Sequence, residues 1–391
     1  MDSFLQPQDI AKSISSLVSK NSLWENKIVN IFVIANKKAG CFTQKNKSKK
    51  YKKILSKAIN LAEKRQTCTK QINSKVFCTE YANHAKELAD SIITQIIANP
   101  QEEETNLLVV AGGDGTSYEV QTALFQAAQQ SEKKHKTVTQ DICLLRLPLG
   151  TGNDGTDGRT LEETINLLLG EIKFEKNPAL KISYQGNPTQ KDVENTGRKV
   201  INLQSSINTA PWFSFNVFSM GIDAYVCYMT NVLKSKMPGN FYHFFIPICA
   251  ILYDKVFPAG TAKVEYYDEN NTLIEEISTP IELFVMGISG QRTYGGGHKI
   301  LATKENTIIV PKLSTLKLLL NFKKIKDGTA YLTNLVKIQN ATKVKIFYDK
   351  PVLIQCDGEP LLLCKEHFPI TIEKSEPIIQ KISPVFRNGA V

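Results

Sequence analysis

The sequence predicts an α/β N-terminal domain with a parallel sheet, followed by a second, β-rich domain whose antiparallel strands form a sandwich or barrel. Up to about residue 170, buried strand-like runs alternate with helix-like runs, which is typical of parallel strands joined by right-handed crossovers. After residue 172, short strand-like runs separated by turn residues dominate. A length of 391 residues also suits two domains better than one.

The change of pattern sets the expected domain boundaries. We expect a short helical extension over residues 1–26, the α/β domain over 27–170 and the β-rich domain over 171–367. The C-terminal residues 368–391 are candidates to return to the first domain.

The first domain is expected to alternate strands and helices in chain order. Strands are predicted at 27–35, 74–80, 106–111 and 141–148. Helices are predicted from the basic stretch near residue 53 to about residue 65, and over 81–100, about 116–130 and 161–169. A polar loop is expected over 131–140. Thr160 and Glu163 form a T-x-x-E capping box for the last helix, and Gly170 ends it.

The second domain is expected to consist mainly of short strands. They are predicted at 180–185, 198–204, 212–220, 261–268, 272–278, 281–289, 307–311, 343–348 and 352–356. A hairpin loop or insertion is expected over 186–197, and a helical segment over about 222–254.

Composition narrows the choice of partners and compartment. The formal charge of +10 favours an anionic partner such as a nucleotide or an acidic membrane surface, although a generally basic surface explains it equally well. The eight cysteines form no C-x-x-C pair, which predicts reduced thiols, an intracellular protein and no zinc site. No signal peptide and no run of ~18 apolar residues is present, so we expect a soluble or peripheral protein.

The segment "VVAGGDGTSYEV" (109–120) places three glycines and one carboxylate between a strand and a helix. Glycines let the backbone approach a phosphate closely, and a helix N-terminus offers free N–H groups and partial positive charge. Asp114 can then bind magnesium or accept a hydrogen bond from a hydroxyl. The alternative is a purely structural turn, and the pattern is not a Walker A loop because no lysine follows the glycines.

Two further loops follow predicted strands. "LPLGTGNDG" (147–155) offers Thr151, Asn153 and Asp154, and "NKKAG" (36–40) offers Lys37 and Lys38. Loops at the carboxyl ends of parallel strands line one crevice, where open α/β sheets bind ligands. A solvated turn is an equally good explanation for either lysine taken singly.

The C-terminal "CDGEP" (356–360) carries two more carboxylates, Asp357 and Glu359. Side chains at i and i+2 of an extended segment point the same way, so both are expected to face one site. The alternative is a D-G turn between two strands.

Together these motifs carry a family resemblance. "IANKKAG", "VVAGGDGTSYEV", "LPLGTGND", "FSMGIDAYV", "TYGGGHK" and "IQCDGEPL" occur in the order found in the diacylglycerol kinase catalytic family, and the chain resembles that family over roughly residues 28–375. The family includes bacterial diacylglycerol kinases, sphingosine kinases and ceramide kinases. The resemblance implies a fold like that of NAD kinases and diacylglycerol kinases, with ATP bound by the α/β domain and the lipid by the β-rich domain.

The resemblance also implies a set of site residues. ATP would be bound by Asn36, Lys37, Lys38, Ala39, Gly40, Thr79, Gly112, Gly113, Asp114, Gly115, Thr116, Ser117, Tyr118, Gly150, Thr151, Asn153 and Asp154. The catalytic residues would be Glu359, Asp357 and Asp114, with the choice of proton acceptor between Glu359 and Asp357 left open. Mg²⁺ would be held by Asp114, Asp154 and Asp223, with Glu305 a weaker candidate; a helix-capping role for Asp223 is the alternative.

The chain departs from the family pattern at several positions. Lys37 stands where relatives have proline, and "GTDGRT" (155–160) replaces an L-A-R segment, so that the arginine is displaced to Arg159 or lost. "TKENTIIV" (303–310) replaces an acidic D-D-G segment, where Glu305 could stand in but Asn306 and Thr307 match poorly. A secondary structural metal site is therefore in doubt.

The expected function is phosphorylation of a lipid alcohol, with diacylglycerol first and a sphingoid base or ceramide next. The apolar segment 231–255, flanked by Lys234, Lys236 and Lys255, and the eight lysines between 37 and 53 are candidates to contact anionic phospholipids, although a buried helix pair and a solvated helix face explain them as well. We expect a cytoplasmic protein peripherally associated with the cytoplasmic membrane face, no nucleic-acid partner, and leave a homodimer open.

Two other interpretations remain. A NAD kinase shares the GGDGT motif, but the G-T-G-N-D loop and the late D-G-E disfavour it. A relative that binds lipid or nucleotide without catalysis is the other alternative, suggested by the departures from the family pattern.

Overall fold

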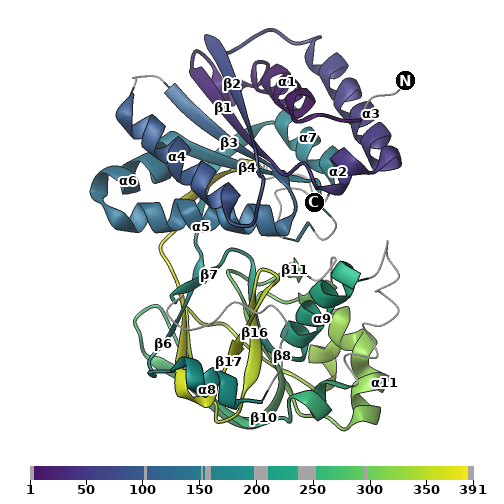
Figure 1. Ribbon diagram of the computed structural model, residues 1–391, viewed down its shortest axis with the longest axis vertical. Coiled ribbons are helices and arrows are strands. Elements are labelled where there is room, and N and C mark those ends of the chain that lie inside the picture. Colours follow the sequence, from purple (N-terminus) through teal and green to yellow (C-terminus); the bar gives the residue numbers. More distant parts are fainter. Residues whose placement is uncertain are drawn as a thin grey trace. The chain divides into compact units, whose positions relative to one another are not determined.

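The structure is a computed structural model of the chain, and it describes residues 4–100, 104–150, 153–154, 160–197, 210–236, 252–294 and 298–385. The chain divides into two compact units (Figure 1). The N-terminal unit comprises Met1–Pro178 and Glu376–Val391, and the C-terminal unit comprises Ala179–Ser375.

The N-terminal unit is built on a six-stranded sheet with the strand order β2-β1-β3-β4-β19-β5. The strands are β1 (Ile28–Ala35), β2 (Gln71–Cys78), β3 (Glu104–Gly112), β4 (Ile142–Pro148), β5 (Ile172–Asn177) and β19 (Ile379–Pro384). All pairings are parallel except that of β5 with β19. The predicted parallel α/β sheet is therefore confirmed.

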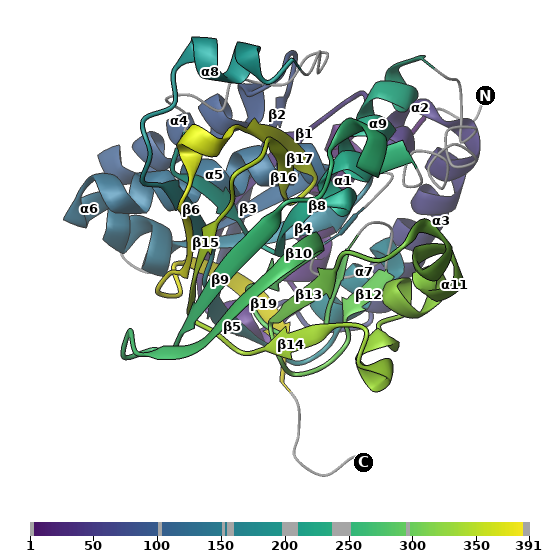
Figure 2. The same ribbon diagram turned by 90° about the horizontal axis from the view of Figure 1, so that it is seen from below.

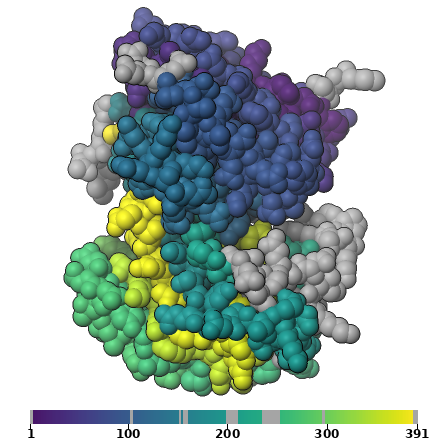
Figure 3. Space-filling model, turned by 60° about the vertical axis from the view of Figure 1, so that its left-hand side comes forward, coloured from purple at the N-terminus to yellow at the C-terminus, as the bar shows by residue number. Residues whose placement is uncertain are grey.

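Helices cover both faces of this sheet, because the central strands are apolar on both sides. One face packs against α1 (Pro7–Val18), α3 (Lys45–Ala62) and α7 (Leu161–Leu169). The other face packs against α4 (His84–Ala98) and α5 (Asp114–Gln130), whose outer surface is blue in Figure 3. Shorter elements complete the unit: η1 (Ser22–Trp24), α2 (Gly40–Thr43), α6 (Glu132–Lys136) and the π-helical η2 (Thr137–Asp141).

Three details differ from the expectations for this unit. The N-terminal residues are part of the core, since Ile10, Ile14 and Leu17 of α1 are buried against the sheet, so they are more than an extension. The expected polar loop over 131–140 contains α6 and η2, and the Ser131 hydroxyl caps α6 by accepting from the Lys134 N–H. β5 pairs with β19, which places the end of the first segment at Pro178 instead of residue 170.

The C-terminal unit contains an antiparallel sheet of eleven described strands in the order β17-β16-β8-β10-β9-β15-β18-β6-β7, with β13 pairing with β10 and β14 (Figure 2). The strands are β6 (Leu180–Tyr184), β7 (Trp212–Ser214), β8 (Val217–Gly221), β9 (Thr261–Tyr267), β10 (Leu273–Gly287), β13 (Thr307–Pro311), β14 (Lys337–Gln339), β15 (Lys343–Phe347), β16 (Val352–Cys356), β17 (Glu359–Leu363) and β18 (Ile370–Lys374). The sheet curves into a half-barrel, which confirms the predicted β-rich, antiparallel domain.

The remaining elements of this unit lie around the sheet. A separate hairpin is formed by β11 (Arg292–Tyr294) and β12 (His298–Leu301). The helical elements are α8 (Gln190–Asn195), α9 (Ile222–Lys236), α11 (Thr315–Lys326), η4 (Ala330–Thr333) and η5 (Lys365–His367). Among the described residues, no helix combines the length and apolar character needed to cross a bilayer.

Sequence patterns did not resolve every element here. The expected hairpin loop over 186–197 contains α8, which a reciprocal capping box between Thr189 and Asp192 begins. The two strands expected at 272–278 and 281–289 form the single strand β10. Its partner changes from β9 to β13 after Pro280, so the proline does not interrupt the strand. The strand expected at 198–204 lies outside the described residues.

Candidate active site

Three polar loops of the N-terminal unit lie at one edge of its sheet. They follow β1, β3 and β4, which run parallel, with Ala35 aligned to Ala111 and Gly112 aligned to Pro148. β2 and β3 flank β1 on opposite sides, so the order of the strands reverses at β1 (Figure 1). Such a switch point, at the carboxyl ends of the strands, is where open α/β sheets bind ligands.

Hydrogen bonds join the three loops to one another. The Asn36 N–H donates to the Ala111 carbonyl at 3.0 Å, and the Asn36 side-chain amide donates to the Thr116 hydroxyl at 3.3 Å. The Leu149 N–H donates to the Gly112 carbonyl at 3.2 Å. The end of β2 reaches the same edge, because the Thr79 N–H donates to the Ala35 carbonyl at 2.9 Å.

The glycines of the second and third loops allow these loops to touch. A Cβ atom added at Gly150 would lie 2.5 Å from the Cα of Gly113, closer than real Cβ contacts. A Cβ atom at Gly112 would lie 2.8 Å from the side chain of Thr116. Two of the glycines therefore serve close packing within the site, in addition to the free approach to a phosphate that the sequence suggested.

The second loop leads directly into α5. Gly113 occupies the N-cap position, and Asp114 lies in the first turn with Gly115, Thr116, Ser117 and Tyr118. The helix begins two residues earlier than expected, so the N–H groups of this turn and the positive end of the helix dipole lie at the loop. An anion next to the loop would meet the N–H groups of this first helical turn.

The third loop is held by its own asparagine. Asn153 has a φ of 58°. Its side-chain oxygen accepts from the Gly150 N–H at 2.9 Å, and its side-chain amide donates to the Gly150 carbonyl at 3.3 Å. Asp154, which follows, is half-buried. Thr151 lies outside the described residues, as do the Asp157 and Arg159 positions at which the chain departs from the family pattern.

The first loop presents positive charge. The Asn36 side chain accepts from the Lys38 N–H at 3.0 Å, which forms a turn on which Lys37 and Lys38 are exposed and Ala39 is buried. Gly40 begins α2, and a Cβ atom there would lie 3.3 Å from the Nζ of Lys47. The sequence does not distinguish Lys47 from the other lysines between 37 and 53. The turn from α2 into α3 brings its side chain back to this loop.

The "CDGEP" motif lies in the C-terminal unit, and its geometry corrects one expectation. Asp357 and Gly358 have φ values of 50° and 93° and form the two-residue turn of a hairpin in which Cys356 pairs with Glu359. This is the turn that Asp-Gly favours. The expected extended segment, with Asp357 and Glu359 pointing the same way, is therefore wrong.

The carboxylate of Asp357 holds the loop between β7 and β8. It accepts hydrogen bonds from the Ser214 hydroxyl at 2.7 Å and from the backbone N–H groups of Phe215, Asn216 and Val217 at 2.5, 3.0 and 3.0 Å. Four donors converge on its two oxygens. Glu359, at the start of β17, is exposed.

A second network connects this hairpin to the first turn of α9. The side-chain Oε1 of Gln355 accepts from the Gly358 N–H at 2.7 Å, and the side-chain Nε2 of Gln355 donates to the Ser219 hydroxyl at 3.0 Å. That hydroxyl donates to Asp223 at 2.6 Å. Hydrogen bonds through Ser219 and the buried Gln355 thus connect Asp223 to the turn that precedes Glu359. The sequence did not single out Gln355.

The expected metal ligands are divided between the two units. Asp114 and Asp154 belong to the N-terminal unit, and Asp223 and Glu305 to the C-terminal unit. Within the described residues, no three acidic, cysteine or histidine side chains cluster in a manner suited to a metal ion. A hydrogen bond from the Thr303 side chain lowers the pKa of Glu305, which is therefore an anion in its own loop.

Asn306 has a structural role beside Glu305. Its side chain donates to the backbone of Ala341 at 2.8 Å and accepts from the same residue at 2.9 Å. It is buried. Asn306, which stands where the family has an acidic segment, therefore holds the backbone of Ala341 by hydrogen bonds.

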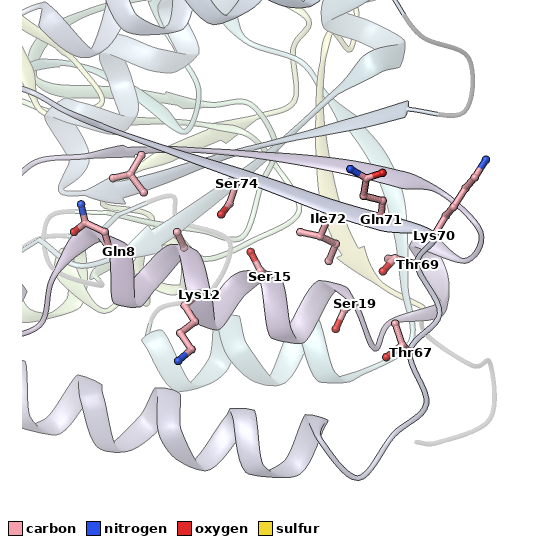
Figure 4. Close-up of a pocket in the computed structure, with 12 residues that line it drawn as sticks. Gln8, Lys12, Ser15, Ser19, Thr67, Thr69, Lys70, Gln71, Ile72 and Ser74 are labelled. Atoms are coloured by element: carbon pink, nitrogen blue, oxygen red, sulfur yellow. The ribbon is translucent and has the colours of Figure 1, made fainter.

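A surface hollow of about 670 Å³ lies elsewhere in the N-terminal unit, between α1 and β2 (Figure 4). Hydroxyl-bearing residues, Gln8, Lys12 and Lys70 line it. None of its lining residues belongs to the loops at the carboxyl edge of the sheet, so it is not the predicted site.

A segment of the chain matches the model of a known protein family. Its model, "Diacylglycerol kinase catalytic domain", matches residues 30–179, which include the loops after β1, β2, β3 and β4. Over these residues the chain is similar to the diacylglycerol kinase catalytic domain.

A curated protein and two solved structures are also similar to this chain. The chain is 26% identical over 230 residues to "Putative lipid kinase YtlR" of Bacillus subtilis (strain 168), a match that covers 59% of this chain and 62% of that protein. A solved structure titled "Crystal structure of a putative diacylglycerol kinase from Bacillus anthracis str. Sterne" is similar in fold, with 15% identity, a TM-score of 0.52 and coverage of 91% of this chain and 96% of that chain. Another diacylglycerol kinase structure from that organism gives 14% identity and a TM-score of 0.49.

Proposed function

We propose that this protein is a lipid kinase of the diacylglycerol kinase catalytic-domain family. It would transfer the γ-phosphoryl group of ATP to the hydroxyl of a lipid alcohol, with diacylglycerol as the first candidate. The observation that carries the proposal is the convergence of three loops, two of them glycine-rich, at the carboxyl edge of the sheet, within the segment that matches the family. A sphingoid base or ceramide is the alternative substrate.

The N-terminal unit has groups suited to binding the phosphates of a nucleoside triphosphate. The first turn of α5 provides backbone N–H donors, and Lys37, Lys38 and Lys47 provide positive charge. Asp114 and Asp154 offer the carboxylate oxygens that Mg²⁺ takes in phosphoryl-transfer sites. The bound Mg²⁺ would neutralise charge on the phosphates.

The proton acceptor is assigned to Glu359. The oxygens of Asp357 already accept four hydrogen bonds, which fits a residue that holds the loop around β7 and β8. Glu359 is exposed beside this turn and can accept the proton that the lipid hydroxyl loses. Asp223 and Gln355 hold the turn from the other side.

The substrate would be met at a membrane, so we propose peripheral association with the cytoplasmic membrane face. The lipid-contacting segment suggested at 231–255 lies largely outside the described residues, as do the side chains of Lys234 and Lys236. That the lysines of α3 contact anionic phospholipids, and that the protein forms a homodimer, are further hypotheses.

The test is incubation of the purified protein with labelled ATP, Mg²⁺ and micelles that contain diacylglycerol, sphingosine or ceramide, with NAD as a separate acceptor. We expect a labelled phospholipid that is absent with Asp114→Asn. Labelled NADP would instead identify a NAD kinase. ATP binding that requires Asp114, without phosphorylation of any acceptor, would favour a relative that has lost catalysis.

A further inference from the structure

The C-terminal unit exposes a group of large apolar side chains on α11 and η4. Leu316, Leu320 and Leu332 are 68%, 71% and 69% exposed. We call the following residues the α11 patch: Leu316, Lys317, Leu319, Leu320, Lys323, Lys324, Tyr331 and Leu332. Figures 1 and 2 show α11 at the edge of this unit, and it contacts β12.

The exposure is not the result of a loosely attached helix. The Ser314 hydroxyl caps α11 by accepting from the Lys317 N–H, and Leu318 and Ile325 anchor the opposite side of the helix in the apolar core of the unit. Leu316 and Leu320 are one helical turn apart and therefore share a face. The structure thus fixes these leucines in an outward position.

Exposed large apolar side chains are otherwise scattered over the described residues. They are Phe4, Leu61, Tyr81, Leu252, Leu273, Ile274 and Val385. Single exposed apolar residues are normal, whereas a gathered group marks an interaction surface. The α11 patch is such a group.

The charges of the segment that contains α11 and η4 favour an anionic partner. Residues 313–337 contain five lysines and a single acidic residue, Asp327. Lys323 and Lys324 are exposed and follow Leu319 and Leu320 by four positions, so that they continue the leucine face toward the C-terminus of the helix. Leucines beside lysines on one surface suit the boundary between the acyl chains and the anionic head groups of a bilayer.

We propose that the α11 patch docks this protein onto an anionic lipid bilayer. A second copy of the chain fits the patch less well, because a two-fold contact would place the lysines of both copies together. α3 differs in kind: it exposes Lys45, Lys49, Lys50 and Lys53 without a comparable group of leucines. The proposal rests on the proposed function for its biological purpose, but docking can be measured without catalysis.

The experiment measures binding of the full chain to vesicles of phosphatidylcholine alone and of phosphatidylcholine mixed with phosphatidylserine, without any lipid alcohol. The variants are Leu316→Asn with Leu320→Asn, and Lys323→Gln with Lys324→Gln. Matched controls are Leu273→Asn with Ile274→Asn, and Lys304→Gln with Lys374→Gln, which are exposed in the same unit. We expect wild type to prefer anionic vesicles, each patch variant to bind them about tenfold more weakly, and the controls to bind like wild type.

A second measurement separates docking from catalysis. Phosphorylation of a short-chain, water-dispersed lipid alcohol should be the same in the patch variants as in wild type, while phosphorylation of the lipid in anionic vesicles falls with binding. Vesicle binding that both patch variants retain would overturn the proposal. So would a dimer in lipid-free solution that Leu316→Asn with Leu320→Asn converts to a monomer. Patch-dependent binding without phosphorylation of any lipid would leave docking standing and remove the proposed function.

Discussion

Gly113 and Gly150 bring two loops of the N-terminal unit into contact, with no space for a side chain on Gly150. A methyl group on Gly150 would lie 2.5 Å from the Cα of Gly113, so Gly150→Ala must displace the backbone of one loop. We expect a loss of about 1–3 kcal/mol in unfolding free energy and a marked fall in ATP affinity.

Gly170→Ala is the matched control for this substitution. Its methyl group would meet the nearest atoms at 3.5 Å, an ordinary contact, at a glycine outside the three loops. Isothermal calorimetry of ATP binding and thermal unfolding would compare the two variants. Unchanged ATP affinity in Gly150→Ala would show that the contact between the loops does not shape the site.

The two carboxylates of the β16–β17 hairpin should separate stability from activity. Asp357→Asn replaces an acceptor of four hydrogen bonds by a group that is partly a donor, and we expect a loss of about 2–3 kcal/mol. Glu359→Gln should leave stability nearly unchanged and lower kcat by about 100-fold or more. Kinase assays and chemical unfolding of both variants decide this. Equal losses of kcat in two stably folded proteins would contradict a single proton acceptor.

Sequence reasoning succeeded where a local pattern has one structural solution. The strands with Val33, Val109 and Leu145 each contain a run of buried apolar residues, which is typical of strands covered on both faces. Once those strands are parallel, the loops that follow them must share one edge of the sheet. The cap of α7 at Thr160 is equally local, and the structure confirms it.

The parts that sequence missed depend on contacts between distant residues. The hydrogen bonds of Asp357 could not be predicted, because its donors, in the loop from Ser214 to Val217, are about 140 residues away. Gln355 lies in the motif "IQCDGEPL", but its hydrogen bond to Ser219 joins residues more than 130 positions apart. Lys47 reaches Gly40 only through the turn from α2 to α3. α11 has leucines on two sides, so its pattern does not distinguish a buried strand from a helix.

The buried Glu282 of the C-terminal unit and its partly exposed partner Lys312 give a third prediction. Glu282 is 1% exposed, and the Lys312 Nζ lies 3.0 Å from it and also contacts Asp254. Lys312→Met leaves Glu282 buried without this cation, and we expect a loss of about 3 kcal/mol. Lys263→Met, at a pair of which the lysine is 42% exposed, should cost less than about 1 kcal/mol.

The loss should depend on pH. Burial raises the pKa of Glu282, and removal of Lys312 raises it further. A carboxyl group whose folded pKa lies above the unfolded value contributes stability below the unfolded pKa and loses it as pH rises through the folded pKa. Lys312→Met should therefore be less destabilised at pH 5 than at pH 8. Unfolding in urea at both pH values measures this, and an equal loss at both would contradict it.

His367 supplies the last prediction, because it is completely buried and its Nδ1 accepts the Cys364 N–H at 3.1 Å. This contact requires an unprotonated Nδ1. Burial lowers the pKa of His367 below its usual value of about 6.5. The neutral imidazole therefore contributes stability above pH 6.5, and this contribution is lost as pH falls through the folded pKa.

The measurement can be confined to the C-terminal unit. The two tryptophans lie in different units, and Trp212 packs on Tyr184, whose ring contacts His367. In a Trp24→Phe background, Trp212 fluorescence would follow unfolding in urea with and without His367→Gln. We expect His367→Gln to lower stability more at pH 8 than at pH 5, because only the histidine loses its contribution in acid. A difference that is independent of pH would show that His367 stabilises the unit by packing alone.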